Sequence, residues 1–230
     1  YESIREYAAS QLVNPDAVLS EDGQSISGNT CLERTAFRMA GHFAQYGTDG
    51  FRNDLYTHNG VDRMRLLQLE LDNLLTSLHR CIAEKNPEIA ARVLFAVCDV
   101  LGRTGPCLLA AECCQLVLKQ VDLTHWDHTK VLIEQSRSLR MAGQMGPSRI
   151  SIKWALAKAE ELDNVTLQAV SHGEKALIHD RSGELDEAFK HHLQAVKLHR
   201  QANNRGPEGR CLGNLGINYR MRGENEKART

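Results

Sequence analysis

Apolar residues recur at spacings of three and four along most of this 230-residue chain, which is the pattern of helices with one buried face. Few residues are aromatic, and the straight side chains that dominate instead favour helix over strand. We therefore predict an all-α protein. The predicted helices span residues 1–12, 31–46, 62–84, 87–103, 106–120, 125–142, 147–162, 165–181, 184–203, 207–222 and 224 onward.

Prolines mark the starts of several predicted helices. Pro87, Pro106, Pro147 and Pro207 each open a helical pattern, where the missing backbone N–H has no partner to lose. Between the N-terminal helices, segments 14–29 and 47–60 are rich in Gly, Asn, Asp and Ser. We expect these two segments to be mobile loops.

A repeat of forty residues organises the C-terminal part of the chain. Gly143, Gly183 and Gly223 follow one another at this spacing, and each comes between two predicted helices. Small residues keep the same register on the second helices: Ser148, Ala188 and Ala228, and also Ala155 and Ala195. Helical hairpins of this kind bury their apolar faces by stacking on their neighbours, which produces a curved row with a concave inner side.

The stretch LGNLGINY and the residues after it carry a specific pattern. Its members are Leu212, Asn214, Leu215, Gly216, Tyr219, Gly223 and Ala228. This pattern resembles the tetratricopeptide repeat. Weaker copies begin near residues 129 and 168, and a fourth over 88–120 fits only through Gly105 and Ala110, so the resemblance covers about the last two-thirds of the chain. The resemblance implies a tetratricopeptide-like α-α superhelix over 85–230. We expect this superhelix to be truncated, because the sequence ends partway into a second helix.

Three segments of the N-terminal third carry a second resemblance. The matching residues are Glu2, Ile4, Arg5, Glu6, Tyr7 and Ala8, then Arg34, Arg38, His42 and Phe43, then Glu70, Asp72, Asn73, Leu74 and Leu78. They are similar to the end of the winged-helix module and the linker helices of bacterial signal-transducing ATPases of the STAND class, which include transcriptional regulators. The resemblance implies an N-terminal helical segment over 1–84, ahead of the repeats. The sequence contains no GxxxxGK[ST] motif, so no nucleotide binding is expected from this chain.

The repeat register predicts a binding surface on the exposed concave side of the first helices. Its candidate residues are Lys130, Glu134, Arg137, Arg140, Glu174, Asp180, Arg181, Arg210, Asn214, Ile217 and Arg220. Arginine and asparagine side chains at such positions can hold the carboxylates or backbone amides of a peptide. A solvated helix face without a ligand explains any single one of these residues equally well.

The remaining polar residues give no sign of catalysis, a cofactor or a metal site. His179 and His192 are predicted to pack as a pair in place of aromatic residues, with His191 and His199 on the solvated side, because two imidazoles do not complete a zinc site. The four cysteines between Cys98 and Cys114 are interpreted as core residues. Cys113 and Cys114 point about a hundred degrees apart on a helix, so at most one of them can share a site with Cys98.

Charge and hydropathy narrow the class of protein further. The net charge is −1, which gives no electrostatic signature of nucleic-acid binding. The chain has no apolar run long enough to cross a membrane and no secretory leader pattern, so we predict a cytoplasmic protein without membrane contact.

These observations predict a non-catalytic sensor or scaffold region of a bacterial signal-transducing ATPase, which binds a protein, a peptide or a small regulatory ligand. Two alternatives stay open. One is a stand-alone tetratricopeptide adaptor for protein complexes, and the other is an accessory region of a kinase or cyclase. An uncovered terminal repeat would also allow the chain to form a homodimer.

Overall fold

The computed structural model describes residues 18–19, 25–26, 28–57 and 59–228. The predicted helix over 1–12 and most of the predicted loop over 14–29 lie outside these residues. The chain forms two compact units, 1–96 and 97–230, and each is described by itself below. The sequence-based boundary between residues 84 and 85 is a matter of family resemblance and stays a prediction.

The first unit is mainly helical. Its elements are β1 (Val18–Leu19), β2 (Ser25–Ile26), α2 (Gly28–Ala44), the 3-10 helix η1 (Gln45–Gly47), α3 (Asp49–Asp54), α4 (Gly60–Leu69), α5 (Leu71–Ala83) and the first part of α6 (Pro87–Thr104). The two short strands pair in antiparallel register, with Val18 opposite Ile26. The sequence pattern did not predict this pair, because two-residue strands leave no period to detect.

Two predictions for the first unit need correction. The segment 47–60 was expected to be a loop, but it contains α3, which begins where the side chain of Thr48 accepts a hydrogen bond from the Phe51 backbone. The segment 62–84 was expected to be one helix, but it is divided into α4 and α5 at Glu70, whose ψ of 6° leaves the helical range. The apolar period continues through Glu70, so the sequence pattern could not locate this break.

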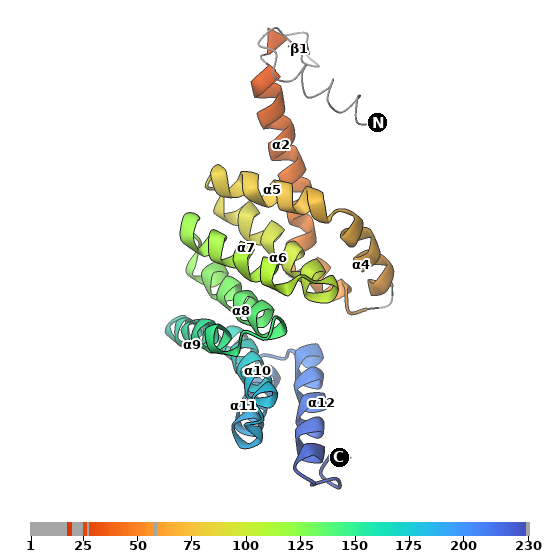
Figure 1. Cartoon of the computed structure of the whole chain (residues 1–230), viewed down its shortest axis with the longest axis vertical. Helices are drawn as coiled ribbons and strands as arrows, with labels where there is room; N and C mark the ends of the chain where they lie inside the picture. Colours follow the sequence, from red (N-terminus) through yellow and green to blue (C-terminus); the bar gives the residue numbers. More distant parts are fainter. Residues whose placement is uncertain (1–17, 20–24, 27, 58, 229–230) are drawn as a thin grey trace. The chain divides into compact units, whose positions relative to one another are not determined.

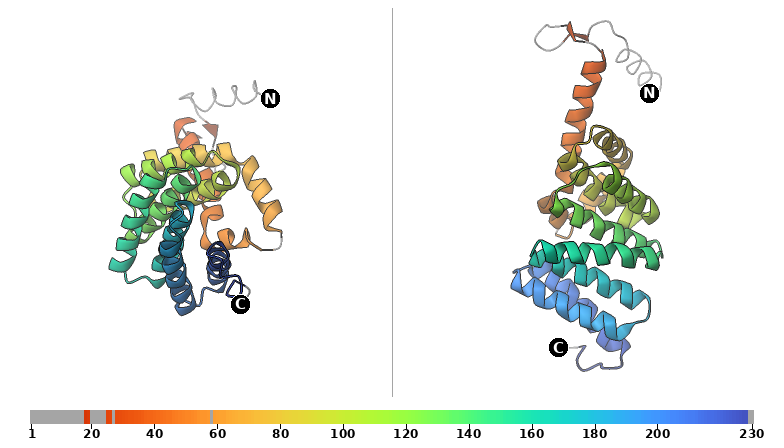
Figure 2. Two further views of the ribbon diagram at one scale, coloured as in Figure 1. Left: turned by 60° about the horizontal axis from the view of Figure 1, so that its bottom comes forward. Right: turned by 90° about the vertical axis from the view of Figure 1, so that its left-hand side faces the viewer.

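The second unit is built from helices α7 to α12 and the last part of α6, as Figure 1 shows. The new helices are α7 (Cys107–Gln120), α8 (His125–Met141), α9 (Met145–Glu161), α10 (Val165–Arg181), α11 (Leu185–Gln201) and α12 (Arg205–Met221). Successive helices pack against each other as antiparallel neighbours, and Figure 2 shows them following one another through the unit. The prediction of an all-α helical-repeat superhelix is confirmed.

The turns of the second unit repeat every forty residues. Gly143, Gly183 and Gly223 have φ values of 80°, 76° and 80°, a left-handed conformation that glycine adopts without steric cost. The turns that join one hairpin to the next have their own left-handed residues, Asp163 and Asn203, which are also forty residues apart. The expected helix from residue 224 is absent from the described part of the chain, because residues 225–228 form turns instead.

Small residues bring the two helices of each hairpin close together. Ser136 of α8 and Ser148 of α9 are fully buried, and each hydroxyl donates a hydrogen bond to the other residue's backbone carbonyl, at 3.0 and 2.8 Å. Ala176 and Ala188 take these two positions in α10 and α11 and are also fully buried. The predicted close approach of the helices at these positions is therefore present in both hairpins.

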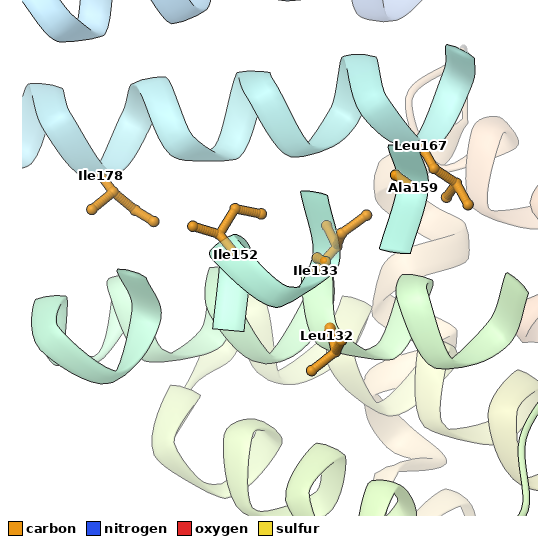
Figure 3. Packing of buried hydrophobic residues seen from close by; sticks show 7 residues of the cluster. Leu132, Ile133, Ile152, Ala159, Leu167 and Ile178 are labelled. Carbon is orange, nitrogen blue, oxygen red and sulfur yellow. The ribbon is translucent and has the colours of Figure 1, made fainter. Parts of the chain in front are cut away.

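A continuous apolar core joins the first hairpin to the second. Leu132 and Ile133 of α8 and Ile152 of α9 pack with Leu167 and Ile178 of α10. Figure 3 shows Ile152 between Ile133 and Ile178, where the three helices meet. Because each hairpin covers the apolar face of the next, the stack fixes the relative position of α8 and α10.

Candidate binding surface on the first helices of the hairpins

The first helices of the hairpins, α8, α10 and α12, are called the inner helices here. α8 contacts α10, and α10 contacts α12, so the three inner helices lie beside one another. The second helices, α9 and α11, pack against them within the hairpins. The eleven candidate residues from the sequence all lie on the inner helices.

Four of the candidate residues form a layer of ion pairs between α8 and α10. The Arg140 Nε donates to Glu174 Oε1 at 2.6 Å, and its Nη2 donates to Oε2 at 3.3 Å. Arg137 lies beside this pair, with its Nε 3.8 Å from Glu174 Oε2 and its Nη1 2.9 Å from Glu134 Oε2. Two guanidinium groups therefore face two carboxylates, and this part of the inner helices carries no net charge.

This layer corrects the exposure predicted for three residues. Glu134, Arg140 and Glu174 were expected on the solvated concave side, but only 6%, 8% and 3% of their surface is accessible to solvent. All three are buried where α8 and α10 pack beside each other. Of this layer, only Arg137 keeps substantial access to solvent, at 35% of its side-chain surface.

A second polar contact links α10 to α11 and α12. Asp180 accepts a hydrogen bond from His192 Nε2 at 2.7 Å through one oxygen and from Asn218 Nδ2 at 3.1 Å through the other. Asn218 also donates to the carbonyl of Leu185, and both His192 and Asn218 are buried. Sequence reasoning missed Asn218. A signal was present, because Asn218 replaces Ile178 of the preceding repeat, a polar side chain at an otherwise apolar position.

The other candidate residues keep access to solvent. Arg181, Arg210, Ile217 and Arg220 are exposed, and Asn214 is partly exposed. Lys130 is half-buried, and its ammonium group lies 5.8 Å from the centre of the Trp126 ring, within reach of a cation–π interaction. The exposed part of the candidate surface is therefore mainly cationic, with apolar side chains among the cations.

The histidines of the second hairpin are arranged differently from the prediction. His191 lies between His172 and His179, with ring centres 5.2 and 5.4 Å away and nearly parallel planes. One Nδ1 of the pair His172 and His191 donates to the other at 3.0 Å. His179 bonds Glu184 instead of pairing with His192, and His199 is buried at 2% exposure instead of solvated.

Burial sets the protonation of this cluster. Desolvation, followed by the charge of Lys175, lowers the pKa of His191 to about 4 and also lowers the pKa of His172. Desolvation is likewise the main cause that lowers the pKa of His199. Hydrogen bonds from Arg149 and His179 lower the pKa of the Glu184 carboxyl. The His172 and His191 rings are therefore neutral near pH 7.

The described side chains include no group of three or more His, Cys, Asp or Glu residues arranged to hold a metal ion. Every helix in the described part of the chain is too short or too polar to span a lipid bilayer. The predictions that the chain needs no cofactor and lies in the cytoplasm stay predictions.

Comparison with known proteins supports the repeat assignment. Residues 167–230, from α10 onward, match the tetratricopeptide repeat family. Among solved structures, the chain is similar to the crystal structure of BtubC (BKLC) from P. vanneervenii, with 14% sequence identity and a TM-score of 0.57 over 69% of each chain. This is a similarity of fold. No curated protein matches the chain.

Proposed function

We propose that this chain is a non-catalytic scaffold that binds a protein or peptide partner along its inner helices. The observation that carries the proposal is the two-level arrangement of charge on these helices. The carboxylates are buried and ion-paired, as Glu174 is with Arg140, while Arg181, Arg210 and Arg220 are exposed to solvent. A rigid, paired layer holds the exposed side chains at fixed spacing, which lowers the entropy lost when a partner binds.

The exposed side chains suit a peptide with carboxylates and an apolar residue. Guanidinium groups bind carboxylates in a bidentate manner, and Asn214 offers both a donor and an acceptor to a peptide backbone. Ile217, with 49% exposure, and Met221, with 57%, lie one turn apart on α12 and supply apolar contact.

The test is a peptide array probed with the full chain, followed by variants that reverse charge. We expect Arg181→Glu and Arg220→Glu to weaken the binding of selected acidic peptides by at least about tenfold each, because the lost attraction becomes repulsion. Arg137 is also one of the candidate residues, but it is unsuitable for this test because a glutamate there would face Glu134 and Glu174.

Matched controls come from the second helices. Lys153→Glu on α9 and Lys197→Glu on α11 make the same change of charge at exposed positions away from the inner helices. Their binding should equal that of the wild-type chain, and all four variants should keep the wild-type circular dichroism. Equal losses in the inner and control variants, or no loss in either, would contradict the proposed surface.

We further propose that the parent protein is a bacterial signal-transducing ATPase, and that this region acts as its sensor arm. The support is the resemblance of the N-terminal segments, including Arg34, Arg38, Asp72 and Asn73, to linker helices of that class. A stand-alone tetratricopeptide adaptor is equally compatible with the repeats. The gene sequence upstream of Tyr1 distinguishes the two, since the sensor proposal requires a nucleotide-binding module there.

A further inference from the structure

Two cysteines of the second unit meet across the α6/α7 hairpin. The Sγ atoms of Cys98 on α6 and Cys114 on α7 are 3.6 Å apart, at a separation where one thiol donates a weak hydrogen bond to the other. Both are free thiols and both are buried, at 5% and 0% exposure. A disulfide requires about 2 Å between the sulfur atoms, so they need to approach by less than about 2 Å.

The other thiols of this region are placed differently. Cys113 is buried next to Cys114 in sequence, but successive residues of a helix point about a hundred degrees apart. Cys107 is partly exposed, and its thiol donates to the backbone carbonyl of Leu101 at 3.7 Å. The hydrogen bond between thiols joins Cys98 to Cys114, so the structure distinguishes one pair from its neighbours.

We propose that Cys98 and Cys114 form a reversible, oxidisable pair, which a small two-electron oxidant converts into a disulfide between α6 and α7. The bond would link two helices whose contact is otherwise non-covalent and would close a loop between residues sixteen positions apart. Such a cross-link resists separation of the two helices because it restricts the unfolded chain.

The reaction balances with a diazenedicarboxamide such as diamide as the oxidant. One thiolate sulfur attacks a nitrogen of the N=N bond and forms an S–N bond. The second sulfur then attacks the first sulfur, the S–N bond breaks, and the disulfide forms. The two thiols lose two protons and two electrons in total, and the N=N group gains them to become a hydrazine.

The environment of the pair sets the pace of this reaction. The hydrogen bond with Cys114 and then burial raise the pKa of Cys98 well above its ordinary value. The thiolate is the reactive form, so oxidation should be slow near pH 7 and faster at pH 9. At any one pH, the pair should therefore react more slowly than an exposed thiol of ordinary pKa.

The test is mass spectrometry of the full chain after treatment with diamide. Trypsin places Cys98 in the peptide 93–103 and the cysteines at 107, 113 and 114 in the peptide 104–119. A Glu-specific protease then cuts after Glu112 and separates Cys107 from Cys113 and Cys114. We expect a cross-link between 93–103 and 113–119 that dithiothreitol reverses.

Single variants assign the partner of Cys98. Cys114→Ser should remove the cross-link, whereas Cys113→Ser and Cys107→Ser should each leave it in place at the wild-type yield. A cross-link that persists in Cys114→Ser, or that joins 93–103 to Cys107, would overturn the proposal. So would a wild-type chain that keeps Cys98 reduced after prolonged treatment at pH 9.

Discussion

The hairpins α8/α9 and α10/α11 have the same backbone plan and different interiors. Five positions that are leucine, isoleucine, alanine or serine in the first hairpin are histidines in the second. The pairs are Leu132 and His172, Leu139 and His179, Ser151 and His191, Ile152 and His192, and Ala159 and His199. In the first hairpin, Leu132, Ile152 and Ala159 belong to one buried apolar cluster, whereas in the second the rings of His172, His191 and His179 stack and His192 donates a hydrogen bond to Asp180.

The difference shows which positions specify the fold. The crossing of the two helices needs small residues, and both hydrogen-bonded Ser136 and Ser148 and apolar Ala176 and Ala188 meet that requirement. Away from the crossing, the interior accepts aliphatic or imidazole groups: Nε2 of His192 donates to Asp180, whereas the buried Nδ1 atoms of His192 and His199 have no hydrogen-bond partner. The second hairpin therefore responds to pH at positions where the first does not.

The largest effect is expected when a histidine is placed in the first hairpin. His192 is accommodated because Asp180 accepts a hydrogen bond from its Nε2, but the residue forty positions before Asp180 is Arg140, which offers no acceptor. Ile152→His should therefore destabilise the chain by about 3 kcal/mol, from lost apolar burial and from an Nε2 that has no carboxylate to accept its hydrogen bond. Urea denaturation at pH 7.5 measures this change.

The matched control for this variant is Ile152→Val, which removes one methylene group and adds no polar atom. Its cost should be about 1 kcal/mol. A histidine variant as stable as the valine variant would contradict this explanation. It would show that a buried histidine is tolerated at this position without an acceptor such as Asp180.

A smaller effect is expected when the pH changes. The pKa of His191 is lowered to about 4 in the folded chain, against about 6.5 when unfolded. Its neutral form is therefore favoured by folding. The contribution of neutral His191 to the free energy of unfolding is fully present above pH 6.5 and declines as the pH falls from 6.5 toward 4.

The variant His191→Ser, which installs the residue of the first hairpin, isolates this contribution. Between pH 7.5 and pH 5.0, the wild-type chain should lose about 1 kcal/mol more than the variant, a value reduced for solvent screening of a partly exposed ring. Urea titrations of both chains at the two pH values provide the measurement. Equal losses of stability in the two chains would mean that folding does not lower the pKa of His191.

The sequence predicted the repeat well because its signals are local and periodic. Gly143, Gly183 and Gly223 have the left-handed backbone that their positions implied, and Ser148 and Ala188 lie at the helix crossing. These residues act within one hairpin, so the sequence of that hairpin alone is enough to interpret them.

The sequence was less informative about the candidate surface, because burial there depends on two repeats at once. Arg140 and Glu174 belong to neighbouring inner helices, and each looks exposed when its own helix is considered alone. Their opposite charges indicate an ion pair only when it is already known that α8 and α10 stack on each other. The same applies to Asn218, which bonds Asp180 from the next repeat.

The central claim is that a buried ion-paired layer couples the inner helices and holds the proposed binding surface in place. A double-mutant cycle with Arg140→Ala, Glu174→Ala and the double variant tests it most directly, with the free energy of unfolding measured in urea. The account predicts a coupling energy of about 2 kcal/mol, because either single change leaves a buried charge with a weaker partner. Costs that add to within about 0.5 kcal/mol would contradict it.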